Sequence, residues 1–254
     1  NPPHKFGYGA DNTALKEDKV RTRRDEVAAV AAIDEDTAEE ALELIRVAYE
    51  ELPALFDPLA ALAPDAPLVH EDKPSNLFTR YDYSHGDGER AFDAKHADVI
   101  VEGDFELPYV THCAMETAFA LASFDLQGRL TLWSSTQIPF LLQRDLSEAL
   151  GMPGRDMRVI QPTIGGAFGR GLDVYPFEPI AALLAKASGK PVRVAFTREE
   201  EFIASAVRQR ARGILTHAEA KDRPQLAMSI VFETDLTVEQ AAKVLAAAPT
   251  QIRG

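Results

Sequence analysis

The segment that decides the fold is Ile164–Gly171, with the sequence IGGAFGRG. It lies between a predicted strand, Met157–Gln161, and a predicted alanine-rich helix, Tyr175–Ser188. Four of its eight residues are glycine, and glycine lets a backbone adopt positive φ angles and bring N–H groups close to a ligand. A loop of this kind that leads into a helix suits an anion. A tight strand-to-helix turn explains the same glycines, so both interpretations stay open at this point.

The segments around this loop have alternating strand and helix patterns. We predict a β-hairpin of Thr117–Phe124 and Arg129–Thr136 around the turn Asp125–Gly128. Phe140–Leu150 has the pattern of an amphipathic helix. The other elements predicted nearby are strands at Val99–Phe105 and Val192–Phe196 and a helix capped by Thr197 and Glu200.

The amino-terminal region has a strand, helix, strand pattern. Val27–Ile33 is predicted to be a buried strand, and Val47–Leu52 a second one. Between them, Asp36 and Glu39 form a capping-box pattern at the start of a helix that continues to Ile45. A proline- and alanine-rich connector follows.

Composition indicates an ordinary soluble chain of one or two domains. The 254 residues are 46% hydrophobic and 26% charged. No apolar run approaches the roughly 20 residues that cross a bilayer, and the first residues lack the order of a signal peptide. We therefore expect a cytoplasmic protein without a membrane partner. The single cysteine, Cys113, excludes a disulfide framework or a cysteine-clustered metal site built from this sequence alone.

The net charge is −13 at pH 7, which argues against a nucleic-acid partner. Residues 212–254 contain five basic and five acidic side chains, so the negative charge lies entirely upstream. This change predicts a domain boundary near Arg212.

Five motifs occur in the order typical of one protein family. They are the amino-terminal segment Val27–Glu51, THCAME at Thr111–Glu116, WSSTQ at Trp133–Gln137, GGAFG at Gly165–Gly169 and FTREEEF at Phe196–Phe202. Together they resemble the molybdopterin-binding large subunit of the xanthine dehydrogenase/aldehyde oxidoreductase family, over residues 5–211. The resemblance implies an α+β fold, with a partial α/β hammerhead domain at residues 1–90 and the first part of a molybdenum-cofactor-binding domain at 98–211.

The tail, residues 212–254, is predicted to be helical and of different origin. Ile214–Phe232 reads as a helix interrupted near Pro224, and a second helix starts at Asp235 or Thr237. The segment is weakly similar to the carboxy-terminal helices of S49/ClpP-like and phage head-maturation peptidases. A natural fusion and an assembly artefact are both open.

The family resemblance implies a set of cofactor contacts. The amide of Gln137 is expected to hydrogen-bond the oxo ligand of molybdenum, to which it can donate without adding charge. Backbone amides of the glycine loop are expected to approach the metal and the pterin, with Phe168 lining the pocket. Arg170 could contact a phosphate or a partner, although a solvated loop arginine explains it equally well. The cofactor-binding residues so predicted are Gln137, Gly165, Gly166, Ala167, Phe168, Gly169 and Arg170.

Two substitutions relative to the family pattern limit this prediction. The frequent third glycine of the loop is Ala167, which makes close approach there less certain. Leu172 occupies the position where some purine-oxidising relatives have a substrate-facing glutamate, which argues against a purine substrate.

Other chemistry-bearing side chains are predicted to be structural. His112, Cys113 and Glu116 lie in a family motif, where a buried cysteine and a satisfied core histidine are the usual roles. Glu199–Glu201 is predicted to be a solvated helix start. The sequence has no zinc-binding histidine pair and no GxSxG motif, so we assign no protein-ligated metal.

By resemblance, the chain is part of a molybdenum hydroxylase, which oxidises an aldehyde or N-heterocycle with water. The implied cofactor is molybdopterin, possibly as a dinucleotide, with [2Fe–2S] and FAD on partner subunits. The remainder of the large subunit and a small-molecule substrate complete the expected partners. The family's general-base glutamate is not in this sequence, so we assign no catalytic residue and expect the chain alone to bind little molybdenum. The alternative is a non-catalytic interaction, remnant or chimeric protein that keeps the scaffold.

Overall fold

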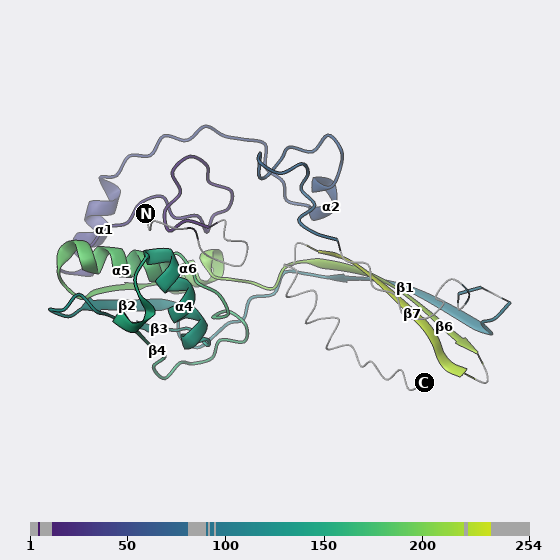
Figure 1. Ribbon diagram of the computed structural model, residues 1–254. Coiled ribbons are helices and arrows are strands. Elements are labelled where there is room, and N and C mark those ends of the chain that lie inside the picture. The colour runs from purple at the N-terminus through teal and green to yellow at the C-terminus, as the bar shows by residue number, and fades with distance from the viewer. Residues whose placement is uncertain are drawn as a thin grey trace. The chain divides into compact units, whose positions relative to one another are not determined.

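The computed structural model describes residues 12–80, 95–220 and 223–234, with residues 5, 90, 92 and 93; for 219, 220 and 223–234 it describes backbone alone. The fold is mixed α+β, as predicted. It divides into two compact units, one formed by residues 1–50 and 111–207 and the other by residues 51–110 and 208–254 (Figure 1). We call them the core unit and the arm unit.

The core unit is built on a four-stranded sheet with the order β4-β3-β2-β5. Its strands are β2 (Phe119–Phe124), β3 (Leu130–Ser134), β4 (Met157–Ile160) and β5 (Val192–Ala195). The predicted hairpin of β2 and β3 is confirmed as an antiparallel pair. Asp125 fixes its turn, because its carboxylate accepts the N–H groups of Gln127 (3.0 Å) and Arg129 (2.9 Å). β4 is parallel to β3, and β5 is antiparallel to β2.

Two helices, α4 (Pro139–Leu150) and α5 (Phe177–Ser188), cover one face of this sheet (Figure 1). Every second residue of β2 and β3 faces them, because side chains alternate between the two faces of a strand. Both helices end at a glycine in the left-handed conformation, Gly151 (φ 62°) and Gly189 (φ 64°). The fully buried members of this core include Ala120, Ala122, Leu130, Leu132, Leu142, Leu146, Ala149, Ala181 and Ala182.

Local capping explains where two further helices begin. In α6 (Arg198–Ala204), Thr197 and Glu200 form the predicted reciprocal capping box. The predicted amino-terminal helix is also present, as α1 (Glu35–Glu43). Its cap is Asp34, which accepts the N–H of Thr37 at 2.9 Å, and not Asp36 as predicted.

The two strands predicted beside α1 are wrong. Val27–Ile33 and Val47–Leu52 form no strand in the structure. A short apolar run becomes a strand only when a neighbouring backbone pairs with it, and among the described residues none does. Ile33, predicted to be buried, is 95% exposed.

The arm unit contains the antiparallel sheet β1-β6-β7. Its strands are β1 (Val99–Leu107), β6 (Ala211–Ala220) and β7 (Arg223–Thr234), and a short helix, α2 (Pro58–Ala61), belongs to the same unit. β1 confirms the predicted strand. Arg212 donates from two guanidinium nitrogens to the carboxylate of Asp104, at 2.6 and 3.0 Å, which ties β6 to β1.

The predicted tail helix at Ile214–Phe232 is wrong, because β6 and β7 occupy this segment. The physical reason is pairing. β6 lies between two strands, and its backbone hydrogen bonds go to both. Pro224, taken as a helix interruption, is near the first residue of β7, where a strand tolerates proline. The second predicted helix, from Asp235 or Thr237, lies outside the described residues, and the separate origin of the tail stays a prediction.

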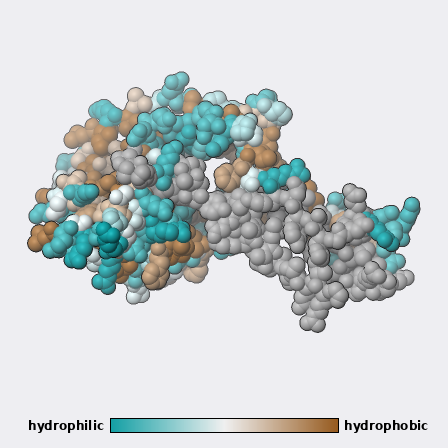
Figure 2. All heavy atoms as spheres, in the orientation of Figure 1, coloured by the Kyte–Doolittle hydropathy of each residue, from teal (hydrophilic) through white to brown (hydrophobic). Residues whose placement is uncertain are grey.

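Large apolar side chains are exposed in both units. The most exposed include Phe56, Met115, Leu126 and Phe140. On the visible face, hydrophobic residues are interspersed with hydrophilic ones (Figure 2). Among the described residues, no helix combines the length and the apolar composition that crossing a bilayer requires.

Candidate functional site

The structure brings Gln137 and the glycine loop together, although they are far apart in sequence. The side-chain Oε1 of Gln137 accepts the N–H of Gly169 at 3.1 Å. The backbone N–H of Gln137 donates to the carbonyl of Gly171, also at 3.1 Å. Thr136 reinforces this contact with a hydroxyl 3.4 Å from the same carbonyl. The end of β3 and the end of the loop are therefore joined by three hydrogen bonds.

These contacts fix the orientation of the Gln137 amide. Because Oε1 receives a hydrogen bond, Nε2 is the free half of the group, and it makes no hydrogen bond within the described part of the chain. The N–H of Gly166 likewise has no partner among the described residues. The site thus offers uncharged donors from a side chain and from the backbone.

Two positions of the loop require glycine for their backbone conformation. Gly166 has φ 117° and Gly169 has φ 104°, both in the region that residues with a Cβ rarely adopt. A Cβ at Gly166 would also lie 2.6 Å from the ring of Phe168. Phe168 itself has φ 54° and a 63% exposed surface, so its ring stands at the outer surface of the loop. Ala167 is buried, with its side chain covered by the fold.

Arg170 is placed differently from the rest of the predicted set. It is buried, and its guanidinium lies 3.3 Å from Glu116 and 3.3 Å from Glu201. This location replaces the solvated arginine considered from sequence, and it directs the positive charge to two carboxylates and not to an external phosphate. Glu201, predicted to be solvated, is only 3% exposed. The sequence did contain one indication that Glu201 is special, because it lies in the family motif FTREEEF. A run of three glutamates by itself, however, predicts exposure to solvent.

His112 and Cys113 lie beside the loop. The Nδ1 of His112 is 3.2 Å from the carbonyl of Ala206, and a Cβ at Gly169 would lie 3.5 Å from its Nε2. Cys113 is exposed, which corrects the expectation of a buried thiol. Its φ is 49°, and it and Phe168 are the non-glycine residues with positive φ among those described. Such backbone strain often accompanies functional loops.

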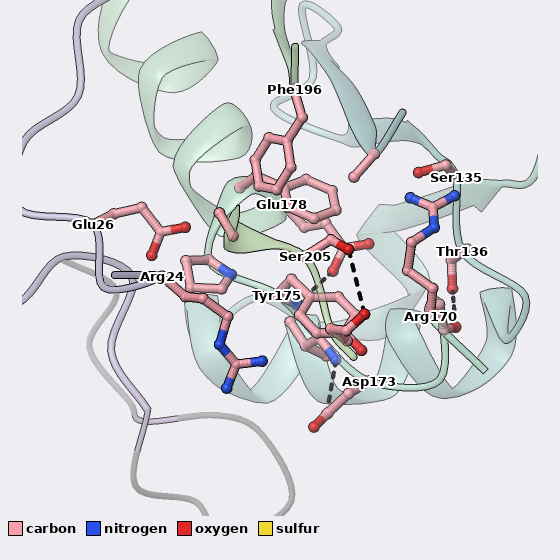
Figure 3. Close-up of a pocket in the computed structure, with 17 residues that line it drawn as sticks. Arg24, Glu26, Ser135, Thr136, Arg170, Asp173, Tyr175, Glu178, Phe196 and Ser205 are labelled. Carbon is pink, nitrogen blue, oxygen red and sulfur yellow. Dashed lines mark hydrogen bonds between the residues drawn. The ribbon is translucent and has the colours of Figure 1, made fainter. Parts of the chain in front are cut away.

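A cavity of about 90 Å³ in the core unit is lined by Arg170 among other residues (Figure 3). Tyr175, just before α5, and Glu178, in the first turn of α5, line it together with Glu26 from the amino-terminal loop. Neither Gln137 nor any residue of Gly165–Gly169 lines it. Of the predicted cofactor-binding residues, Arg170 alone therefore lines this cavity.

Buried carboxyl groups give this cavity unusual acid–base properties. Burial raises the pKa of Glu178 to about 7, although the Ser134 hydroxyl and the Tyr175 N–H, at 2.6 and 2.9 Å, favour the charged form. Burial also raises the pKa of Glu26 to about 7 and, for the same reason, the pKa of the Tyr175 phenol. Sequence reasoning missed Glu178, because a single glutamate in an alanine-rich helix gives no signal of burial.

The residues present fit a pterin cofactor better than a bare metal ion. Within the described segments, no three His, Cys, Asp or Glu side chains gather in a way that could hold a metal. The Gln137 amide and the N–H of Gly166 are uncharged donors, which suit the oxygen and nitrogen acceptors of a large, partly anionic group.

Family models match most of the chain. Residues 69–252 match the molybdopterin cofactor-binding domain. Residues 3–53 match the aldehyde oxidase and xanthine dehydrogenase a/b hammerhead domain. The chain belongs to the xanthine dehydrogenase/aldehyde oxidoreductase family.

Individual relatives and solved structures support the same family assignment. It is 42% identical, over 196 residues, to a putative xanthine dehydrogenase molybdenum-binding subunit of Escherichia coli K12, covering 77% of this chain and 25% of that protein. It is 33% identical to the carbon monoxide dehydrogenase large chain of Afipia carboxidovorans, covering 87% of this chain and 29% of the other. Among solved structures, aldehyde oxidoreductase from Desulfovibrio gigas has 28% identity and a TM-score of 0.76, covering 87% of this chain and 24% of that one.

The similarity covers most of this chain but only part of each relative. The chain spans about a quarter of the length of the Escherichia coli relative. The comparisons show that this family member contains the hammerhead region and the start of the molybdopterin-binding region of a large subunit.

Proposed function

We propose that this chain is the molybdopterin-binding part of a molybdenum hydroxylase large subunit, which oxidises an aldehyde or an N-heterocycle with water. The observation that supports this most directly is the bond from Gly169 N–H to Gln137 Oε1, which leaves Nε2 as an oriented, uncharged donor. In this proposal Gln137 donates to the cofactor. Gly166 offers its N–H to the same group, and the loop brings its backbone close because glycine has no Cβ.

The bound cofactor would supply two-electron redox chemistry at molybdenum, and iron–sulfur and flavin partners would take the electrons onward. In this proposal the residues of the chain itself bind the cofactor and orient it. Phe168 shields the outer side of the loop with its exposed ring. Leu172, 44% exposed at the loop's end, presents no charge, which disfavours a purine that needs a carboxylate there. The family's general base would come from outside this sequence.

The test is cofactor retention by a Gln137→Leu variant. We expect the full chain, purified from its native host with its associated polypeptides, to contain molybdenum and pterin. Gln137→Leu should lower both about tenfold, the size of effect typical for a partner that orients a bound metal group. Metal analysis and pterin fluorescence provide the two readouts.

Gln127→Leu is the matched control. Gln127 lies in the exposed turn between β2 and β3, where the same substitution leaves the loop untouched. Its cofactor content should equal that of the parent. If the parent complex from the native host contains neither molybdenum nor pterin, the proposal fails and the non-catalytic alternative stands.

A further inference from the structure

Three charged side chains from three different motifs meet behind the glycine loop. Arg170 directly follows the GGAFG motif, Glu116 ends THCAME, and Glu201 is in α6, within FTREEEF. The Arg170 Nη2 is 3.3 Å from Glu116 Oε1, and its Nε is 3.3 Å from Glu201 Oε1. The side chains of Arg170 and Glu201 are each 4% exposed, and that of Glu116 is 26% exposed. We call these residues the charged triad.

Each carboxylate of the triad also holds backbone with its second oxygen. Glu201 Oε2 accepts the N–H of Ala118 at 2.7 Å, at the entrance to β2. Glu116 Oε2 accepts the N–H of Gly165, the first glycine of the loop. The Met115 N–H donates to the Gly165 carbonyl at 3.3 Å. Both the N–H and the carbonyl of Gly165 are therefore hydrogen-bonded to the THCAME segment. The triad therefore connects the loop to the sheet through charge and through backbone contacts.

Arg170 also restrains the loop from the other end. Its backbone N–H donates to the carbonyl of Ala167 at 2.8 Å, which closes the turn that contains Phe168. The next contact along the chain is Gly169 N–H to Gln137 Oε1. A displacement of Arg170 would therefore be transmitted directly to the amide that we propose to orient the cofactor.

The charge balance argues against a phosphate-binding role for this arginine. One guanidinium faces two carboxylates, so the triad has a net negative charge when both are ionised, and an added anion would be repelled. Removing one member of a buried ion pair leaves its partner uncompensated, which makes such groups sensitive to substitution.

We infer that Glu116, Arg170 and Glu201 are positioning residues that set the conformation of Gly165–Gly169 and, through Gly169, the direction of the Gln137 amide. This inference rests on the proposed function for its purpose, but the coupling itself can be measured without any cofactor. If the triad contributed only to global stability, substituting one of its residues would loosen the whole core unit. If the triad positions the loop, the substitution loosens the loop before the sheet.

The experiment is amide hydrogen exchange, followed by NMR, on the full chain with Arg170→Met and Arg170→Lys. In Arg170→Met we expect the amides of Gly165 and Gly169 to exchange about tenfold faster, while those of Leu132 and Ala122 in the sheet keep their rates. Arg170→Lys should lie between parent and Met, because an ammonium keeps the charge but cannot reach two carboxylates from one planar group.

Arg144→Met is the matched control. Arg144 also pairs with a carboxylate, Asp145 at 2.7 Å, but its side chain is 63% exposed on α4. Its loss should change none of these rates. If Arg170→Met does not fold, Glu116→Gln repeats the test: its amide oxygen can still accept from Gly165, but the charge facing Arg170 is lost, and we expect about threefold faster exchange at Gly165 and Gly169.

Uniform acceleration of loop and sheet amides in Glu116→Gln, or unchanged loop amides in either variant, would overturn the inference. A second arm adds free molybdopterin to the parent and variant chains and follows pterin fluorescence. Binding to the parent but weaker binding to the variants supports both proposals. If no isolated chain binds molybdopterin yet the loop amides respond as expected, the triad's positioning role stands. If, in addition, the native complex contains neither molybdenum nor pterin, the proposed function is what has failed.

Discussion

At the scale of single residues, Glu178 shows how burial sets acid–base behaviour in the core unit. It is fully buried, and both of its oxygens accept hydrogen bonds from neutral donors, the Ser134 hydroxyl and the Tyr175 N–H. Two neutral donors offset only part of the cost of removing a carboxylate from water, so the pKa rises to about 7 from an ordinary 4.5. The bond from Ser134 links α5 to the end of β3, and the bond from Tyr175 holds the segment that leads into α5.

The pH dependence of stability follows from this shift. The folded state keeps the Glu178 proton between about pH 4.5 and 7, where the unfolded chain releases it, so the free energy of unfolding falls as pH rises through this window. Glu178→Gln cannot lose a proton and can still pair with both neighbours. We expect its stability relative to the parent to improve by on the order of 3 kcal/mol from pH 4.5 to 7.5.

Urea unfolding at several pH values measures this difference. Because Glu26 titrates in the same window in both proteins, comparing parent with variant isolates Glu178. A constant difference across the window would show that the carboxyl is ionised throughout in the folded protein.

At the scale of elements, helix ends are set by a few local groups. Gly189 ends α5 with φ 64°, its N–H donates to Ala185 at 3.0 Å, and a Cβ there would meet nothing within 4 Å. Glycine is therefore favoured at position 189 by the left-handed backbone conformation and not by lack of space for a Cβ.

Gly189→Ala should lower the free energy of unfolding by about 1 kcal/mol, and Gly189→Asn by less, because asparagine tolerates the left-handed conformation. Thermal or urea unfolding measures both. Gly154→Ala is the control: its φ is not in the left-handed region and its nearest contact would be Ser147 Oγ at 3.8 Å, so the effect should be small. Equal losses at Gly189 for alanine and asparagine would contradict the conformational explanation.

At the scale of the whole molecule, the predicted cofactor surface is open. Phe168 is 63% exposed, and the chain spans about a quarter of its Escherichia coli relative. Half-covered donors compete with water for their acceptors, which weakens binding of a large polar group.

We therefore expect the chain purified alone from a molybdopterin-producing bacterium to contain well below one molybdenum per chain. Co-expression with the remaining part of a relative's large subunit should raise that content severalfold, as measured by metal analysis of the purified complex. The Gln137→Leu variant, co-expressed in the same way, should gain less. Stoichiometric molybdenum in the isolated chain would show that the described surface is sufficient by itself.

The sequence alone determined the elements whose signals are local. The hairpin turn at Asp125, the capping box at Thr197, the glycine end of α4 and the glycines of the loop all act within a few residues of their own position, so pattern and residue type suffice. The resemblance also pointed to the family and to Gln137, although it could not supply the contact from Gly169 that orients the amide.

Only the tertiary structure decided which segments pair and which charges are buried. Val27–Ile33 has the composition of a strand but no described partner, whereas Ile214–Phe232, predicted to be helical, lies in strands β6 and β7. Glu201 and Arg170 look like solvated charges because their partners are distant in sequence. Hydrogen bonds between strands and the burial of ion pairs depend on distant neighbours, and local residue patterns do not specify those neighbours.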